Sequence, residues 1–346
     1  MTGAPRKVRF RDTQVEMAHG AGGKASRRLV EGLFAPILFG SSTEPLGDAA
    51  HLSINGTRVA VTTDSFVVRP LRFPGGSIGE LAVNGTVNDL AVSGARAVAL
   101  VVSYVLEAGL ATEVLEAEIR AMADAAARAG VMIAGGDTKV VEHGKADGMY
   151  ITTSGVGRAI PELNISPKRV QVGDQVILSG PIGDHGITIL LARGELDLEA
   201  DLHSDTRSVL PFIEALARAA GDGVHWMRDP TRGGVATSLN ELALDCGLAI
   251  VIEEEKIPVR DSVRGACELL GLDPLHIANE GQFLAVVARD AAGAALQALH
   301  QTPGGECATL LGEIAAQPAG AVVVKTLYGG SRIVDMLVGD PLPRIC

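Results

Sequence analysis

Four aspartates in the first half of the chain combine the right chemistry with a suggestive spacing. Each is predicted at a strand end or in a turn, and each lies beside glycine or other small residues. Acids at such positions converge at the edge of a sheet, where hard carboxylate oxygens suit Mg²⁺ held together with ATP phosphates. Any one of them alone is more commonly a turn or helix-capping residue. Together they favour a metal site formed by Asp48, Asp64, Asp89 and Asp137.

Lys139 follows Asp137 by two residues. In an extended segment this spacing places both side chains on one face. A lysine beside magnesium ligands would stabilise the charge of a transferring phosphoryl group. A solvated ion pair is the equally simple alternative.

A glycine-rich segment, residues 19–24 (HGAGGK), precedes a predicted helix. Backbone amides in such a segment can hold phosphates. It is not a Walker A loop, since Ala18 stands where the first glycine belongs and Ala25 follows the lysine. A flexible N-terminal loop remains an alternative. The predicted nucleotide contacts here are Gly20, Gly22, Gly23 and Lys24.

Cys346 ends the sequence, after a proline-containing stretch. A thiol on such a tail can visit other active sites, since the stretch from Gly339 extends over roughly 22 Å at ~3.1 Å per residue. Terminal residues are also commonly disordered and without a role, so an accidental terminal cysteine is the alternative.

Composition bounds the class of protein. The chain has 346 residues, enough for two domains, and 47% of them are hydrophobic. Its aromatic residues are 7 Phe, 3 Tyr and 1 Trp, which argues against a base-stacking platform for nucleic acid. A formal net charge of -11 argues against binding a phosphate backbone.

No signal peptide and no membrane-spanning run is visible, so we expect no membrane contact. The four cysteines are widely separated and form no C-x-x-C, which predicts neither a zinc site nor a disulfide framework and fits a cytoplasmic protein. His185 and His225 lack metal-ligand spacing, and we assign them no chemistry.

The elements that position these residues alternate between strand and helix patterns, which predicts an α/β or α+β protein with a sizeable sheet. Strands are predicted at 59–68, 97–106 and 150–156, helices at 78–92 and 112–129, and a strand at 131–134 that enters a Gly-Gly turn. After a break at 161–167 the alternation restarts. Strands are then predicted at 174–178, 248–253, 282–288, 308–313 and 320–327, and helices at 185–193, 206–220 and 234–246.

Taken together, eight segments resemble the HypE family of hydrogenase maturation proteins, in the PurM-like ATP-binding superfamily. The resemblance runs nearly end to end, and the final Pro-Arg-Ile-Cys is its most specific part. The segments are 19–24 (HGAGGK), 47–50 (GDAA), 62–67 (TTDSFV), 88–91 (NDLA), 135–139 (GGDTK), 229–234 (DPTRGG), 279–281 (NEG) and 343–346 (PRIC).

The resemblance implies two α/β domains and a homodimer formed through the N-terminal sheet. We expect an N-terminal Gly-rich segment at 1–45, an ATP-binding and dimerisation domain at 46–160, a second domain at 168–335 and a mobile tail at 336–346. It also implies a reaction. The carbamoyltransferase HypF places a carbamoyl group on the terminal thiol, the group is dehydrated to a thiocyanate with ATP, and the cyano group passes to iron on the HypC–HypD complex.

The same resemblance implies roles for particular residues. Cys346 would carry the substrate, Lys139 would stabilise charge near the amide oxygen, and Glu280 would take a proton. ATP would contact the glycine-rich segment and also Thr63, Asp64, Asn88 and Asp137.

Two rival functions remain. One is a sister enzyme of the superfamily, such as a selenophosphate synthetase, a thiamine-phosphate kinase or an aminoimidazole ribonucleotide synthetase. The other is a non-catalytic carrier that presents Cys346 to partners; the acid cluster argues against it.

Overall fold

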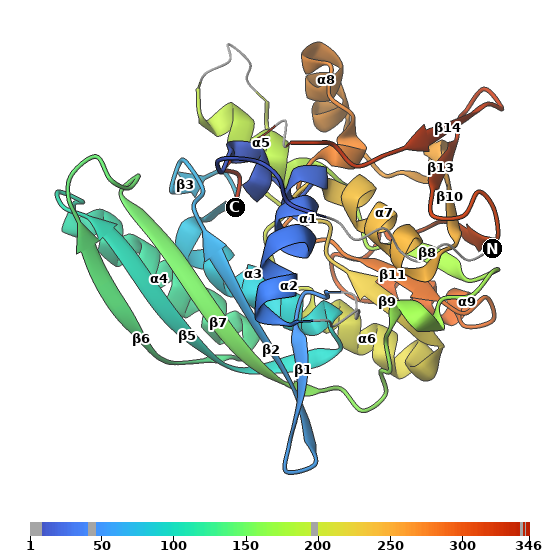
Figure 1. Ribbon diagram of the computed structural model, residues 1–346, viewed down its shortest axis with the longest axis horizontal. Helices are drawn as coiled ribbons and strands as arrows, with labels where there is room; N and C mark the ends of the chain where they lie inside the picture. The colour runs from blue at the N-terminus through green and yellow to red at the C-terminus, as the bar shows by residue number, and fades with distance from the viewer. Residues whose placement is uncertain (1–8, 41–45, 195–199, 340–341, 343) are drawn as a thin grey trace.

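The computed structural model describes residues 9–40, 46–194, 200–339, 342 and 344–346. The predictions for the first eight residues, and the part of the tail motif at Pro343, lie outside the described residues. Two sheets dominate the molecule, one from each half of the sequence, with helices packed against them (Figure 1). Within the described ranges, no helix combines the length and the apolar character needed to cross a bilayer.

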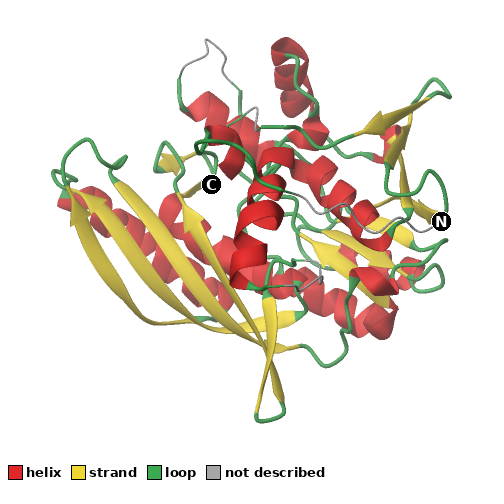
Figure 2. Ribbon diagram, in the orientation of Figure 1, coloured by secondary structure: helices red, strands yellow, loops and turns green. Residues whose placement is uncertain are grey.

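The first sheet has five strands in the order β1-β2-β7-β5-β6. All neighbouring strands are antiparallel except β5 and β6, which are parallel. Helices α3 and α4 pack on one face, and Figure 2 shows the strands of this sheet in front of them. The bounds are β1 Ala50–Ile54, β2 Thr57–Phe66, α3 Ile78–Val92, β5 Ala95–Glu107, α4 Thr112–Ala129, β6 Met132–Val141 and β7 Met149–Ala159.

The second sheet has seven strands in the order β14-β13-β10-β12-β8-β11-β9. Its strands are β8 Gln175–Leu178, β9 Val224–Arg228, β10 Ala249–Glu253, β11 Leu284–Val287, β12 Thr309–Ala315, β13 Val322–Lys325 and β14 Ser331–Val334. Its helices are α5 Asp184–Ala192, α6 Leu210–Ala220, α7 Gly234–Cys246, α8 Asp261–Leu270 and α9 Ala292–His300. Shorter elements are α1 Lys24–Leu29, α2 Ala35–Leu38, β3 Arg72–Phe73 and β4 Gly76–Ser77.

The α/β class is confirmed, and the helices predicted at 78–92 and 234–246 have the observed bounds. Three details differ. Gly135 and Gly136 lie inside β6 and make no turn, because both pair with β5. Asp89 lies in helix α3, and Asp64 lies within β2 and does not end it.

The open face of the first sheet carries apolar side chains. Val101 in β5, Val156 in β7 and Leu52 in β1 are all exposed. The strand register places Asp137 beside Ser103 and Lys139 beside Val105, so both lie on the same open face as Val101. The opposite face is buried under α3 and α4 and forms part of the core.

That core does not stop at the boundary between the two halves. Ile187 in α5 and Ile277 pack in the same buried cluster as Leu81 and Ile151 of the first domain. Leu342 and Ile345 of the C-terminal tail belong to this cluster too. The two domains and the tail therefore share one packed interior, and a site between them has fixed walls.

Candidate active site

A cavity of about 220 Å³ lies where the two domains meet, and charged groups from both domains line it. Gly22 and Thr63 contribute to its wall as well. The charged residues are Asp48, Asp64 and Asp89 from the first domain and Arg228, Asp229, Arg232 and Glu241 from the second.

Three carboxylates are held unusually close together. Asp48 precedes β1, Asp89 lies in α3 and Asp229 directly follows β9, and one oxygen from each lies within 4.8 Å of the others. The Thr62 hydroxyl lies 2.9 Å from Asp89 Oδ2 and 2.7 Å from the backbone oxygen of Asp48. Elements from both domains therefore converge on one set of hard oxygen ligands.

Burial makes this arrangement costly without a cation. Desolvation raises the pKa of Asp48 to about 6, against the opposing charge of Arg228. Desolvation, and then the charge of Asp48, raise the pKa of Asp229 to about 8. Burial and the charge of Asp229 likewise hold the pKa of Asp89 well above its usual range. A divalent cation would relieve this repulsion, so the donor set fits Mg²⁺.

Arg228 and Arg232 partly balance the acids. The Arg228 guanidinium lies 3.0 Å from Asp48 and 2.8 Å from Glu241. The charge on Cys346 is the main cause that raises the pKa of Arg232, and the charges of Asp64 and Glu280 add to it. Arg232 therefore stands between the acids and the end of the tail.

The glycine-rich segment meets the cavity at one residue. Gly22 has φ +77°, and a Cβ there would lie 2.7 Å from Arg232 Cβ, so the loop can approach this closely only with glycine. Arg232 Nη1 donates to the Gly20 oxygen at 3.0 Å. The Lys24 amide already donates to the Leu337 oxygen at 2.8 Å, and its ammonium pairs with Asp335. Those groups of Lys24 are therefore engaged away from the cavity.

Asn88 has a different place from the one predicted. Its amide nitrogen donates to the backbone oxygens of Arg207 and Glu280, and its oxygen accepts from the Val209 amide. Asn88 is buried and ties α3 to the second domain. Thr63 does line the cavity, while its hydroxyl also lies 2.8 Å from that of Ser154.

Asp137 and Lys139 lie apart from the other predicted site residues. Their side chains are 62% and 67% exposed and pair with each other at 2.6 Å on strand β6. This pairing lowers the pKa of Asp137. Among the described residues of this single chain, neither lines the cavity that contains Asp48, Asp64 and Asp89.

The described end of the tail does not line the cavity either, but the charge of Cys346 acts on Arg232, which does. Ile345 is 1% exposed, and the Val67 amide donates to the Cys346 backbone oxygen at 3.0 Å. The Arg69 amide donates to the Arg344 oxygen, and the Arg344 side chain pairs with Asp147. The tail therefore lies along residues 67–69, directly after β2. Strand β2 itself carries Asp64.

Glu280 is a buried acid with the properties expected of a general base. It is 3% exposed, and its Oε1 has no hydrogen-bond partner among the described residues. Burial, and then the charges of Asp229 and Asp64, hold its pKa well above the usual range. A carboxylate in such surroundings is a strong base once it is ionised.

Sequence reasoning missed the second-domain half of the site. The DPTRGG pattern at 229–234 favours a turn that leads into a helix, and the structure has that turn before α7, but the pattern alone does not indicate a role in the site. Asp229, Arg232 and the preceding Arg228 stand at a strand end, as the first-domain acids were expected to do. That shared position was the available signal.

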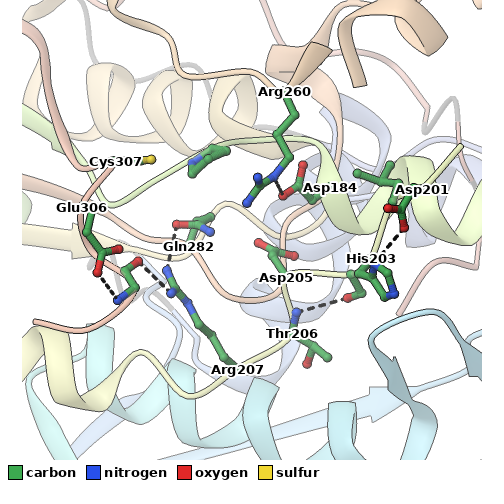
Figure 3. A pocket seen from close by; sticks show the side chains of 14 residues that line it. Asp184, Asp201, His203, Asp205, Thr206, Arg207, Arg260, Gln282, Glu306 and Cys307 are labelled. Atoms are coloured by element: carbon green, nitrogen blue, oxygen red, sulfur yellow. Dashed lines mark hydrogen bonds and ion pairs between the residues drawn. The ribbon is translucent and has the colours of Figure 1, made fainter. Parts of the chain in front are cut away.

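A larger cavity, of about 550 Å³, has Asp205, Arg207 and Gln282 in its wall (Figure 3). Asp205 lines it and accepts hydrogen bonds from the backbone amides of Glu280 and Gly281. Its charged groups pair with one another or with the backbone: Arg260 binds Asp184, and Arg207 binds the Gly281 and Gly304 oxygens. The smaller cavity is therefore the one that gathers unneutralised acids.

Comparison with known proteins agrees with this geometry. Two family models match the chain: AIR synthase related protein, N-terminal domain, over residues 46–159, and AIR synthase related protein, C-terminal domain, over residues 171–325. Carbamoyl dehydratase HypE of Azotobacter vinelandii is 45% identical over 340 residues, which cover 98% of this chain and 99% of that protein.

Two solved structures are similar over most of the chain. A HypE–HypF complex matches with a TM-score of 0.84 and 43% identity, covering 89% of this chain and 99% of the other. HypE in complex with ATP matches with a TM-score of 0.80 and 42% identity, covering 96% and 100%. The chain therefore belongs to the AIR synthase related family, with its PurM-like fold, and within that family to the HypE proteins of hydrogenase maturation.

Proposed function

We propose that this protein dehydrates a carbamoyl group carried on the Cys346 sulfur to a thiocyanate, with ATP as the second substrate. The amide oxygen attacks the γ-phosphorus of ATP, and ADP leaves. The C–O bond then breaks with loss of phosphate while both N–H protons are removed, so that a C≡N bond forms. Phosphorylation is needed because an amide oxygen is otherwise a very poor leaving group.

The observation that carries the proposal is the position of the tail. Ile345 is buried between the domains, and the charge of Cys346 acts on Arg232, which also faces Asp64 and Glu280. In the proposed reaction, a substrate on this sulfur would be presented by its own chain to the acid-lined cavity, whose wall includes Arg232. Such delivery replaces a bimolecular encounter with an intramolecular one.

The residues of the cavity suit magnesium and ATP. Asp48, Asp89 and Asp229 would hold Mg²⁺, with Asp64 beside them, because their crowded carboxylates, one buried and two half-buried, need a cation. When bound, the ion supplies charge neutralisation for the phosphates. Gly22 and Thr63 would border the nucleotide. A HypE protein that is 42% identical has been solved with ATP, which supports the same ligand here.

Two groups of the chain would handle protons and charge at the amide. Glu280 has an unpartnered Oε1 and a raised pKa, so it would take an N–H proton. Arg232 would hold the tail end in place through its charge.

Lys139 and Asp137 would act only in a homodimer. We place the dimer interface on the open face of the first sheet, where exposed Val101 and Val156 would be buried. Asp137 and Lys139 lie on this face, too far along the edge strand to line the cavity of their own chain. A partner subunit would therefore bring them to the nucleotide.

The proposed partners follow from the tail. HypF would load the carbamoyl group on Cys346, and the relative solved as a HypE–HypF complex supports this contact. The HypC–HypD complex would receive the cyano group for the hydrogenase iron. Both steps require the tail to leave the cleft in which it is docked.

The rivals have less support. A thiamine-phosphate kinase type of enzyme shares the fold, but a solved example is only 20% identical, against 43% for HypE in its complex with HypF. A carrier without catalysis would have no need for three crowded carboxylates at the junction of the two domains.

The test is mass spectrometry of the C-terminal peptide after incubation with HypF, carbamoyl phosphate and ATP. We expect the carbamoylated peptide to lose one water. In Glu280→Gln the carbamoylated peptide should accumulate, because loading is left intact while dehydration is slowed. A wild-type peptide that stays carbamoylated in the presence of ATP would refute the reaction.

A further inference from the structure

His185 is a completely buried histidine that the proposed chemistry does not use. It lies in α5, with its Nε2 2.6 Å from the Ile345 backbone oxygen and its Nδ1 2.8 Å from the Ser204 hydroxyl. A carbonyl oxygen only accepts, so Nε2 must carry the proton. Nδ1 then accepts from the Ser204 hydroxyl, and the tautomer is assigned by these two contacts.

Ser204 is itself fixed. Its hydroxyl oxygen accepts from the Thr206 amide at 3.1 Å, and its amide donates to the Pro74 oxygen at 2.9 Å. Ser204 forms part of the wall of the larger cavity, in which Figure 3 labels the neighbouring Asp205 and Thr206. The imidazole also packs edge-on against Phe73, with ring centroids 5.6 Å apart. The ring orientation is therefore determined on every side.

The environment keeps this ring neutral. Burial lowers the pKa of His185 to about 4, despite the hydrogen bond to Ile345. A neutral N–H donor matches a neutral carbonyl and leaves no uncompensated charge between the domains.

The hydrogen bond from His185 is one of several that both domains make to the tail. The first domain supplies the Val67 amide to Cys346 and the Arg69 amide to Arg344. The second supplies His185 to Ile345 and Arg193 to Arg344. Ile345 is the residue next to the substrate-bearing sulfur, so its carbonyl controls where that sulfur lies.

We propose that His185, oriented by Ser204, is a positioning residue that holds the tail in its docked place and sets the fraction of time the Cys346 sulfur spends at the acid-lined cavity. This inference rests on the proposed function, since it assumes that docking presents the substrate. Without the imidazole, the buried Ile345 oxygen would lose its donor. We expect the undocked population to rise roughly tenfold, the usual effect of one lost buried hydrogen bond.

Hydrogen exchange of the Val67 amide measures docking directly, because that amide donates to Cys346. In the full-length protein, His185→Ala should exchange roughly tenfold faster at Val67. His185→Gln, which can place an amide nitrogen near the Nε2 position, should restore most of the protection. Ser204→Ala, which leaves the imidazole in place but removes the hydroxyl that donates to its Nδ1 and accepts from the Thr206 amide, should give an intermediate rate.

His225→Ala is the matched control. His225 is also a buried histidine of the second domain, bound to Asp174 at 2.7 Å, but it makes no contact with the tail among the described residues. We expect its loss to leave Val67 exchange unchanged. The inference is overturned if folded His185→Ala and Ser204→Ala exchange at the wild-type rate, or if His225→Ala gives the same acceleration as His185→Ala.

This readout needs no carbamoyl chemistry. If the Val67 amide exchanges at the wild-type rate in both His185→Ala and Ser204→Ala, the positioning role of His185 is refuted, and the proposed dehydration is unaffected. If the Val67 amide exchanges faster in these two variants but the wild-type C-terminal peptide is never dehydrated, the proposed function is refuted and the positioning role of His185 stands.

Discussion

Asp229→Asn should make the metal-free protein more stable and the enzyme inactive. The pKa of Asp229 is about 8 in the folded protein and near 3.8 when unfolded, owing first to burial and then to Asp48. Below pH 4 the residue is protonated in both states and costs nothing. As the pH rises from about 4 to 8, only the unfolded state loses the proton, so the folded state becomes progressively less favourable. Asparagine has no such dependence.

The size of the effect follows from the same values. About three pH units separate the unfolded pKa from neutrality, and each is worth ~1.4 kcal/mol, which gives about 4 kcal/mol at pH 7. The asparagine amide must still find hydrogen-bond partners in the cavity, which takes back about 1–2 kcal/mol. We therefore expect a net gain of about 2–3 kcal/mol at pH 7 and a net loss of about 1–2 kcal/mol at pH 4, where the ionisation gain vanishes and the cost of the amide remains.

Urea unfolding at pH 5 and pH 8 in EDTA is the assay. Asp137→Asn is the matched control, because Asp137 is exposed, its pKa is lowered by Lys139, and its loss should bring no gain. In Mg²⁺ and ATP the order should reverse, since the wild type gains stability from its ligands and Asp229→Asn does not. A variant that is less stable than wild type at pH 8 in EDTA, or equally stabilised by Mg²⁺ and ATP, would refute the reasoning.

Two further predictions concern the dimer and the glycine-rich loop. Lys139→Ala and Cys346→Ala should each be inactive alone. When subunits of the two variants are mixed, half of the dimers contain one of each and therefore carry one complete site, so about a quarter of wild-type dehydration should return. No recovery on mixing would place Lys139 in its own chain's site. Gly22→Ala should weaken ATP binding at least tenfold, because its Cβ meets Arg232 and its φ is positive. Gly20→Ala, with nothing within 4 Å of the added Cβ, is the control and should bind ATP normally in calorimetry.

Small neighbours and expected strand ends or turns were enough to predict Asp48, Asp64 and Asp89 as part of one site, and all three line the cavity, although Asp64 and Asp89 lie inside regular elements. Asp64 lies in a clear strand, and the small-residue helix that carries Asp89 has the predicted bounds. Their convergence with Asp229 was not accessible, since that contact joins residues some 140 to 180 positions apart and no local period encodes it. Local propensity correctly predicts the turn that leads into α7, and tertiary packing also places Asp229, Thr231 and Arg232 of that turn in the wall of the cavity.

The tail and β6 show the same limit in two forms. Two glycines at 135–136 favour a turn locally, yet pairing with β5 carries the strand through them. The prolines near the end favour a mobile arm, which stays a prediction, but they do not indicate that Ile345 and Leu342 are buried. Binding of the tail depends on His185, Val67 and Arg193, which no pattern in the tail itself identifies.

The burial of Leu342 and Ile345 has a consequence for every partner that receives the arm. Withdrawing these two aliphatic side chains from the shared interior exposes both them and the slot they leave, at a cost of roughly 1.5–3 kcal/mol for each. The withdrawn form is therefore brief when the protein is alone. A partner protein that binds the withdrawn tail long enough to react with the sulfur must therefore provide an apolar pocket next to its own active site. That pocket would bind the side chain of Ile345, which precedes the cysteine.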